Sequence, residues 1–258
     1  MKTAIALLLL SCFLAASHAF RCEEAPRYYG LRQFDAGQGM LVATNRYRTL
    51  MLTGTHWSLL SYQRFRHISI GRSGLWATDS SNKLFKMVGS KFLEATGLKL
   101  KVVAAGGNDF LMGVRASDNR TVCVRGSSAL HYKGVGSVSW VLKTNIMKEI
   151  SCGQNRCWAV DSSNRVYVMW NINQYCGGTS WVRVTGTSLK SVKVGQDGTV
   201  FGVMPNGVIC ERRGITNSNP RGSSWREFPM CIAVDRLAYD LGRLWIASKS
   251  GLLLECRR

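Results

Sequence analysis

The feature that most limits the fold of this chain is a segment that recurs along its 258 residues. Each copy holds an alternating apolar strand, a glycine-containing turn, a second apolar strand, a polar turn and a third strand. The copies start near Leu31, Phe65, Leu100, Met147, Leu189 and Cys231. These starts lie 34 to 47 residues apart, and a period of this size indicates propeller blades or another stacked array.

Each copy has the pattern of β-strands and lacks that of helices. Apolar residues occupy every second position, as at Phe34 and Ala36 or at Ile68 and Ile70, whereas a helix would repeat them at every third and fourth. A glycine closes the first strand of five copies, where we expect a hairpin that needs positive φ. These glycines are Gly37, Gly71, Gly106, Gly153 and Gly195.

Tryptophan marks a probable fourth strand after four of the copies. These residues are Trp57, Trp140, Trp181 and Trp225. Six copies of four strands predict an all-β, six-bladed β-propeller that occupies residues 20–258 as one domain. A long β-solenoid is the alternative, and the irregular repeat lengths argue against it. The sixth copy ends after its third strand, so we expect the segment 20–29 to supply the missing strand and close the ring.

The first 19 residues have the pattern of a secretory signal peptide. Met1-Lys2 precedes a short apolar run from Ala4 to Ala16, and Ser17-His18-Ala19 is a small-x-small cleavage site before Phe20. The run is shorter than the roughly 18 apolar residues that span a bilayer. We therefore expect a secreted, extracellular protein with no transmembrane segment.

Removing this leader leaves eight cysteines out of nine, an even number that indicates four disulfides in a secreted chain. Eight cysteines allow 105 pairings, and the expected strand register selects among them. Closure of the ring pairs Cys22 with Cys256, and a hairpin brings Cys152 opposite Cys157. The junction of the fifth and sixth copies favours Cys210–Cys231, which leaves Cys123–Cys176 between the third and fourth copies. No C-x₂-C spacing suggests a zinc site.

Two segments carry the repeat in its fullest form: residues 75–79 with 84–85, and residues 157–161 with 166–167. Both read aliphatic or Cys, then Trp-Ala-x-Asp, followed by an aliphatic–aromatic pair, as at Trp76 and Trp158. This pattern resembles the tectonin repeat, whose usual form is close to Val-Trp-Gly-Val-Asn followed by Ile-Tyr. With a leader, six repeats and terminal cysteines, the mature chain resembles secreted fish-egg lectins of the tectonin β-propeller family.

The resemblance implies a lectin of innate defence that binds glycans on bacterial surfaces, such as lipopolysaccharide or N-acetylglucosamine-type sugars. Composition adds a separate argument. The chain has 34 basic and 15 acidic residues, a net charge of +19 that becomes +18 without Lys2. This charge would draw the protein to anionic surfaces. The alternative function is therefore a secreted cationic module that binds anionic polymers or a protein without sugar specificity; a homo-oligomer also stays open.

Polar turns at equivalent places in three copies are the candidate sugar contacts. Their residues are Asp79, Asn82, Asp118, Asp161 and Asn164. Asp and Asn side chains bind sugar hydroxyls, and repetition would raise avidity, but the same residue types also occur simply because they form turns. Trp170, before a polar loop, breaks the repeat pattern and is a sixth candidate, although most of the tryptophans are expected in the core between blades.

Asn119 begins the one N-x-S/T sequon, Asn119-Arg120-Thr121, so it is a candidate glycosylation site that would block its own turn. Basic residues gather in three places, either as solvated faces or as an anion-binding patch: at Arg64, Arg66, His67 and Arg72, at Arg212, Arg213, Arg221 and Arg226, and at Arg257-Arg258. Interleaved aromatics would also suit nucleic acid, which export disfavours.

No enzyme is predicted. The chain after the leader has three scattered histidines and no H-E-x-x-H or G-x-S-x-G motif, and its cysteines are assigned to disulfides, so no catalytic constellation remains. We expect no cofactor and no metal site, and the sequence leaves a calcium requirement open.

Overall fold

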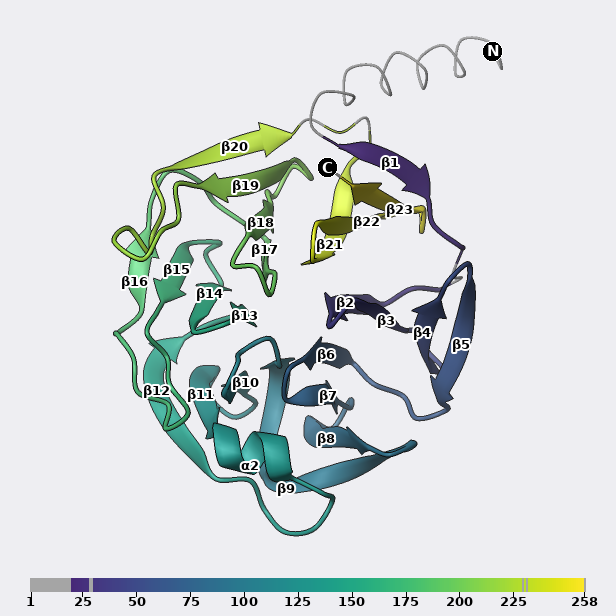
Figure 1. Cartoon of the computed structure of the whole chain (residues 1–258), viewed down its shortest axis with the longest axis vertical. Helices are drawn as coiled ribbons and strands as arrows, with labels where there is room; N and C mark the ends of the chain where they lie inside the picture. Colours follow the sequence, from purple (N-terminus) through teal and green to yellow (C-terminus); the bar gives the residue numbers. More distant parts are fainter. Residues whose placement is uncertain (1–19, 28–29, 229, 231, 258) are drawn as a thin grey trace.

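The computed structural model describes residues 20–27, 30–228, 230 and 232–257. The predicted leader, residues 1–19, lies outside this part of the chain. The described residues form antiparallel β-sheets arranged radially around a central axis (Figure 1), with one short helix, α2 (Gly126–His131), between two strands. The prediction of an all-β propeller is confirmed, and α2 is an element that the sequence did not predict.

Three of the sheets have four strands that follow the chain from the axis outward. The first contains β2 (Gln33–Gly37), β3 (Met40–Thr44), β4 (Thr49–Thr53) and β5 (His56–Ser61). The second contains β13 (Glu149–Gly153), β14 (Arg156–Val160), β15 (Val166–Met169) and β16 (Val182–Val184). The third contains β17 (Ser191–Val194), β18 (Val200–Val203), β19 (Ile209–Arg213) and β20 (Ser224–Phe228).

One sheet has seven strands, because a single long strand belongs to two repeats. Its strands are β6 (His67–Gly71), β7 (Gly74–Thr78), β8 (Lys83–Val88), β9 (Lys91–Ala104), β10 (Phe110–Arg115), β11 (Arg120–Arg125) and β12 (Trp140–Ile146). The first part of β9 pairs with β8, and its last residues pair with β10. The expected boundary at Leu100 therefore falls inside a strand. The described chain forms five sheets, and the predicted count of six blades stays a prediction.

The last sheet closes the ring as predicted. It contains β21 (Val234–Asp240), β22 (Arg243–Ser248), β23 (Leu253–Arg257) and, from the other end of the chain, β1 (Arg21–Glu24). β1 pairs antiparallel with β23, with Cys22 opposite Cys256, and these two residues form a disulfide across 234 residues of sequence. The inner strands β2, β6, β9, β13, β17 and β21 contact one another in a closed circuit.

Two further disulfides match the predicted pairing: Cys123–Cys176 and Cys152–Cys157. The fourth pair, Cys210–Cys231, finds no support. Cys210 is a free, buried thiol within the described part of the chain, packed among residues of the second and third four-stranded sheets, with its Sγ 3.8 Å from the Gly202 carbonyl oxygen. Cys231 lies outside the described residues. The register of β19 directs the Cys210 side chain into this core. The length of the loop that follows β19 could not reveal this orientation.

The core lies between neighbouring sheets, as expected for the repeated tryptophans. Trp76, Trp158 and Trp245 are fully or almost fully buried. Trp158 packs with Val192 and Val200 of the following sheet. Burial of one large aromatic side chain contributes about 1.5–3 kcal/mol, so these residues bind each sheet to the next.

The strand-ending glycines are needed for a reason other than the predicted one. None of the five has positive φ; that conformation occurs instead at following turn residues such as Gly39 and Gly198. A Cβ added to Gly71 would overlap the Ala105 carbonyl oxygen of the next inner strand, and one added to Gly106 would overlap the Cys152 carbonyl oxygen. The glycines therefore allow neighbouring inner strands to converge at one end of the axis.

Candidate functional site

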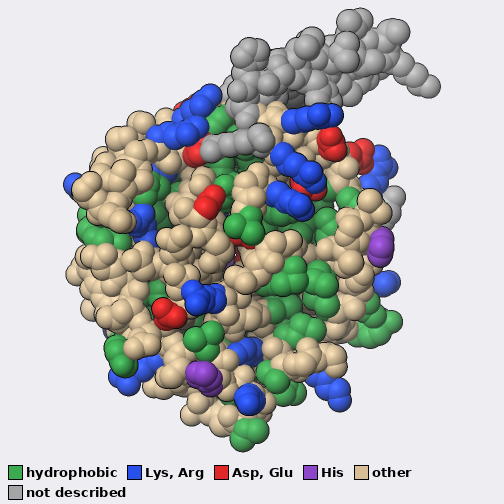
Figure 2. Space-filling model, viewed as in Figure 1, with side chains coloured by type: hydrophobic (Ala, Val, Ile, Leu, Met, Phe, Trp, Pro, Cys, Tyr) green, Lys and Arg blue, Asp and Glu red, His purple; other side chains and the backbone are tan. Residues whose placement is uncertain are grey.

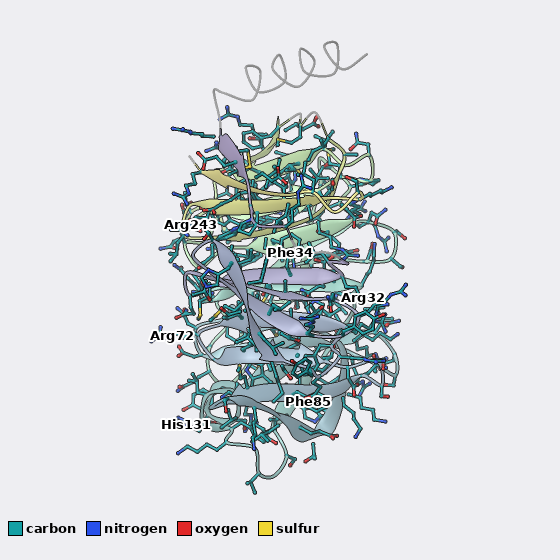
Figure 3. All side chains as sticks on the ribbon, turned by 90° about the vertical axis from the view of Figure 1, so that its right-hand side faces the viewer. Arg32, Phe34, Arg72, Phe85, His131 and Arg243 are labelled. Atoms are coloured by element: carbon teal, nitrogen blue, oxygen red, sulfur yellow. A yellow bond between two sulfur atoms is a disulfide. The ribbon has the colours of Figure 1, made fainter. Side chains whose placement is uncertain are left out.

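The central axis has two different ends. All the inner strands run in the same sense, so their first residues gather on one face and their hairpins on the other. Figure 3 shows Arg32, which precedes β2, at one edge of the molecule, with the hairpin residues Arg72 and Arg243 at the opposite edge. Figure 2 looks onto this hairpin face, where acidic and basic side chains lie scattered among other residues.

The opposite face carries a basic residue at the same place in five repeats, five residues before the strand-ending glycine. We call these residues the basic mouth: Arg32, Arg66, Lys101, Lys148 and Lys190. In the sixth repeat Asp235 stands five residues before Asp240. The sequence analysis missed this pattern, although counting back from each glycine would have revealed it.

Two lysines of the basic mouth form hydrogen bonds with the backbone of the following repeat. Lys148 Nζ donates to the Lys190 carbonyl oxygen at 3.4 Å, and Lys190 Nζ donates to the Val234 carbonyl oxygen at 3.0 Å. Lys190 also forms an ion pair with Asp235 at 3.3 Å. Lys101 instead donates to Asn119 Oδ1 at 2.7 Å, within its own repeat. These contacts hold the cations around the axis.

A pocket of about 410 Å³ opens between three repeats on this face; we call it the mouth pocket. It is lined by Arg66, His67, Lys101, Val102, Asn119, Ile146, Met147, Lys148 and Ser162. No Asp or Glu is among these lining residues, and Arg66, Lys101 and Lys148 form no ion pair with the described residues. The pocket is therefore a concave, positively charged site with an apolar side.

His67 is neutral at physiological pH despite its basic surroundings. Burial lowers the pKa of His67 to about 3, and the positive charges of Lys193 and Arg66 act in the same direction. Its Nδ1 is buried and has no hydrogen-bond partner among the described residues. The ring therefore adds no charge to the wall of the mouth pocket, and its buried Nδ1 is not exposed there.

Deeper along the axis, acidic residues are paired with one lysine. Lys193 Nζ lies 3.8 Å from Asp35 Oδ1 and 3.7 Å from Glu149 Oε1. Asp35 Oδ2 also accepts hydrogen bonds from Ser69 Oγ at 2.8 Å and from the Ile70 amide at 3.1 Å. Burial raises the pKa of both carboxyls, and Lys193 opposes this rise. The carboxylates nearest the axis are thus already engaged below the mouth pocket.

The carboxylates of the predicted polar turns are engaged by their own turns. Asp79 Oδ1 accepts the amides of Ser81 and Lys83, each at 2.9 Å. Asp161 Oδ1 accepts two amides in the same way, and its Oδ2 is 2.6 Å from Arg165 Nε. Such bonds are the signature of Asx turns. A sugar could reach only the remaining acceptor positions.

Asp118 is held by arginine in addition to its turn. The guanidinium of Arg115 forms a bidentate ion pair with this carboxylate and keeps the pKa of Asp118 well below its usual range. The Arg120 amide donates to the same carboxylate at 3.1 Å. The charge of Asp118 is therefore balanced within its own repeat.

The turn asparagines connect consecutive repeats. Asn82, Asn119 and Asn164 all have φ near +60°. Their carbonyl oxygens accept the amides of Leu100, Met147 and Leu189, respectively, at 2.9 to 3.0 Å. These residues therefore have a structural role at the face where the inner strands begin, which we call the strand-start face. Ligand contact by these turns stays a prediction. Two of the turns contribute to the wall of the mouth pocket, through Asn119 and Ser162.

The last two predicted residues, Trp170 and the sequon residue Asn119, lie at opposite ends of the sheets. Trp170 directly follows β15, at the hairpin end of the second four-stranded sheet, where the Ile172 amide bonds to the Asn155 carbonyl oxygen. It is therefore remote from the turns and does not line the mouth pocket. Asn119 of the sequon is half-buried with its side chain on Lys101, and Thr121 is buried. Glycosylation of Asn119 stays a prediction, and a glycan there would lie in the mouth pocket.

Within the described residues, no cluster of three or more His, Cys, Asp or Glu side chains could hold a metal ion. No helix in that part of the chain is long and apolar enough to cross a membrane.

Radial sheets, a strand-paired closure and repeated tryptophans between sheets define a β-propeller built from sequence repeats. Solved structures share this fold, including human WBSCR16 (TM-score 0.55, 9% identity, 88% of this chain and 71% of that chain). Yeast Prp20p from Saccharomyces cerevisiae is similar at a TM-score of 0.58 with 10% identity over 87% and 71% of the two chains. Identities this low indicate the fold alone.

The sequence comparisons are more specific. The tectonin domain matches residues 30–249, so this chain belongs to the tectonin family. It is 30% identical to the Fish-egg lectin of Cyprinus carpio over 157 residues, which are 60% of this chain and 65% of that protein. A tectonin β-propeller repeat-containing protein of Drosophila melanogaster is 32% identical over 90 residues, only 6% of its length.

Proposed function

We propose that this chain is a secreted, non-catalytic lectin that binds glycans on bacterial surfaces, either lipopolysaccharide or N-acetylglucosamine-type sugars, in innate defence. The observation that carries the proposal is the tectonin match together with the similarity to the carp Fish-egg lectin. The disulfides are consistent with an oxidising, extracellular compartment. Residues 1–19 would be the leader that directs export.

In this proposal, residues 20–258 form one six-bladed propeller, and the seven-stranded sheet counts as two blades that share β9. The repeated turns on the strand-start face supply hydroxyl and amide groups suited to sugars. The mouth pocket is a concavity among these turns, and its volume lies within the range of ligand pockets.

A glycan array that includes bacterial polysaccharides and free-sugar competition tests this function. We expect saturable binding that a free sugar displaces at physiological salt. Binding to no glycan, or binding that no free sugar displaces, would contradict the proposal.

The second candidate function is a secreted cationic module that binds anionic polymers without sugar specificity. The cation-lined mouth pocket without an acidic lining residue favours it. The same array at two salt concentrations separates the two functions, since binding driven by charge alone falls steeply as salt rises. Sugar-specific binding would retain its rank order of glycans at the higher salt.

A further inference from the structure

Three cations from three different repeats line one concavity. Arg66 directly precedes β6, Lys101 lies within β9, and Lys148 directly precedes β13. They are 35 and 47 residues apart in sequence, and the packing of the three consecutive inner strands β6, β9 and β13 brings them together. Repulsion among like charges disfavours such a cluster unless an anion compensates it.

The neighbouring acids compensate this charge only in part, through the electrostatic interaction of Glu149 with Lys148. Asp118 is paired with Arg115 and Arg120, while Asp35 and Glu149 share Lys193 deeper along the axis. Lys101 and Lys148 donate only to neutral oxygens, those of the Asn119 side chain and the Lys190 backbone. The mouth pocket therefore keeps a net positive charge that is available to bind an anionic ligand.

The rest of the pocket wall has the mixed character that a sugar ring requires. Val102, Ile146 and Met147 form its apolar side, and the Ile146 side chain is 58% exposed. Asn119 and Ser162 supply an amide and a hydroxyl to this wall. Apolar contact with a few polar groups that fix orientation is typical of small-ligand sites.

We propose that the mouth pocket binds a sugar that carries a sulfate or phosphate ester, with the ester oxygens between Arg66, Lys101 and Lys148. The inference rests on the proposed lectin function and names the ligand class of that site. A planar carboxylate is satisfied by one bidentate arginine. Cations that surround a pocket from three strands instead suit an oxyanion with three terminal oxygens, and lysine ammonium groups serve such anions as point charges.

The matched probes are N-acetylglucosamine, its 6-sulfate and its 6-phosphate, titrated by calorimetry at one fixed ionic strength. The mature chain is produced in a bacterial periplasm, where disulfides form and Asn119 stays unmodified. The variants R66Q and K148Q each remove one charge from the mouth pocket. The matched control is R72Q, which removes one exposed charge on the hairpin face (Figure 3).

We expect at least one ester sugar to bind about tenfold more tightly than N-acetylglucosamine. In R66Q or K148Q, the affinity for this ester sugar should fall to about that for N-acetylglucosamine. R72Q should keep the preference. The sulfate and phosphate arms identify which ester is favoured. Equal affinity for the three sugars, or an equal loss in R72Q, would overturn the inference. If neutral glycans still compete on the array in that case, the lectin function stands; if no sugar competes, both fail.

Discussion

The hairpin end and the basic mouth are built from the same inner strands, yet one is closed and the other is open. At the hairpin end, glycines such as Gly71 and Gly106 lie so close to the next strand that a Cβ would overlap its carbonyl oxygen. At the mouth, the equivalent strands begin with long cationic side chains around a 410 Å³ pocket. The contrast indicates that the hairpin end serves ring assembly, whereas the mouth keeps the open pocket that we propose as the ligand site.

The largest effect is expected where the two ends meet, at Lys193. The change Lys193→Met removes the cation that pairs with the buried Asp35 and Glu149 carboxylates, which should cost about 3–5 kcal/mol near pH 7. Burial already raises the pKa of both carboxyls, and loss of Lys193 raises it further. Their folded-state pKa then exceeds the unfolded one, so stability falls as the pH rises from about 4 through the raised pKa.

Urea unfolding of this variant at about pH 4.5 and about pH 7 measures the effect. The loss relative to wild type should be smaller at the lower pH, where the carboxyls are protonated. The matched control adds Asp35→Asn and Glu149→Gln to Lys193→Met, which removes the pH dependence. An equal loss at both pH values would show that the ion pairs do not stabilise the axis.

At the hairpin end, the addition of one methyl group to a strand-ending glycine should destabilise the fold. We expect Gly106→Ala to lower the free energy of unfolding by about 3 kcal/mol, because the new Cβ meets the Cys152 carbonyl oxygen. Gly39→Ala is the control: it has open space but φ of +73°, so it should lose only about 1 kcal/mol. Denaturant midpoints of the two variants compare them. A loss in Gly106→Ala no larger than the loss in Gly39→Ala would contradict the role of close strand approach.

The disulfide Cys152–Cys157 fastens one hairpin end across five residues. Replacement of both cysteines by serine should destabilise the protein by about 2 kcal/mol in the chain-entropy model for so short a loop. Binding of ester sugars should not change, since the bridge lies at the end remote from the mouth pocket. Thermal unfolding and the calorimetric titration check the two statements, and a loss of affinity at unchanged fold would contradict the separation of the ends.

The smallest effect is expected at the exposed arginines of the two faces. Arg66→Gln and Arg72→Gln should each change stability by less than about 0.5 kcal/mol, as surface substitutions usually do. Only Arg66→Gln should weaken ester-sugar binding. Thermal melts without ligand measure the first statement. A clear stabilisation by Arg66→Gln would additionally measure the repulsion within the basic mouth.

Local patterns in the sequence predicted much of the fold because they depend on short-range geometry. The alternation in each copy and the turn residues around Asp79 and Asp161 identified the strands and hairpins. The pairing of Cys152 with Cys157 followed from one hairpin. The expected repeat start at Leu100 coincides with the point where the pairing of β9 passes from β8 to β10. What the local pattern did not predict is that β9 continues through Gly97 (φ +85°) as one strand, and that register places Cys210 in a core rather than at a junction.

The sequence by itself determined the repeat, the all-β class and the positive charge, since each depends on residues close together in the chain or on composition. Only the tertiary structure decided which charges gather and which are neutralised. Arg66, Lys101 and Lys148 become neighbours because the three consecutive inner strands β6, β9 and β13 pack together. Asp118 is already paired within its own repeat. Electrostatic energy depends on distance and burial, and neither can be read from residue number.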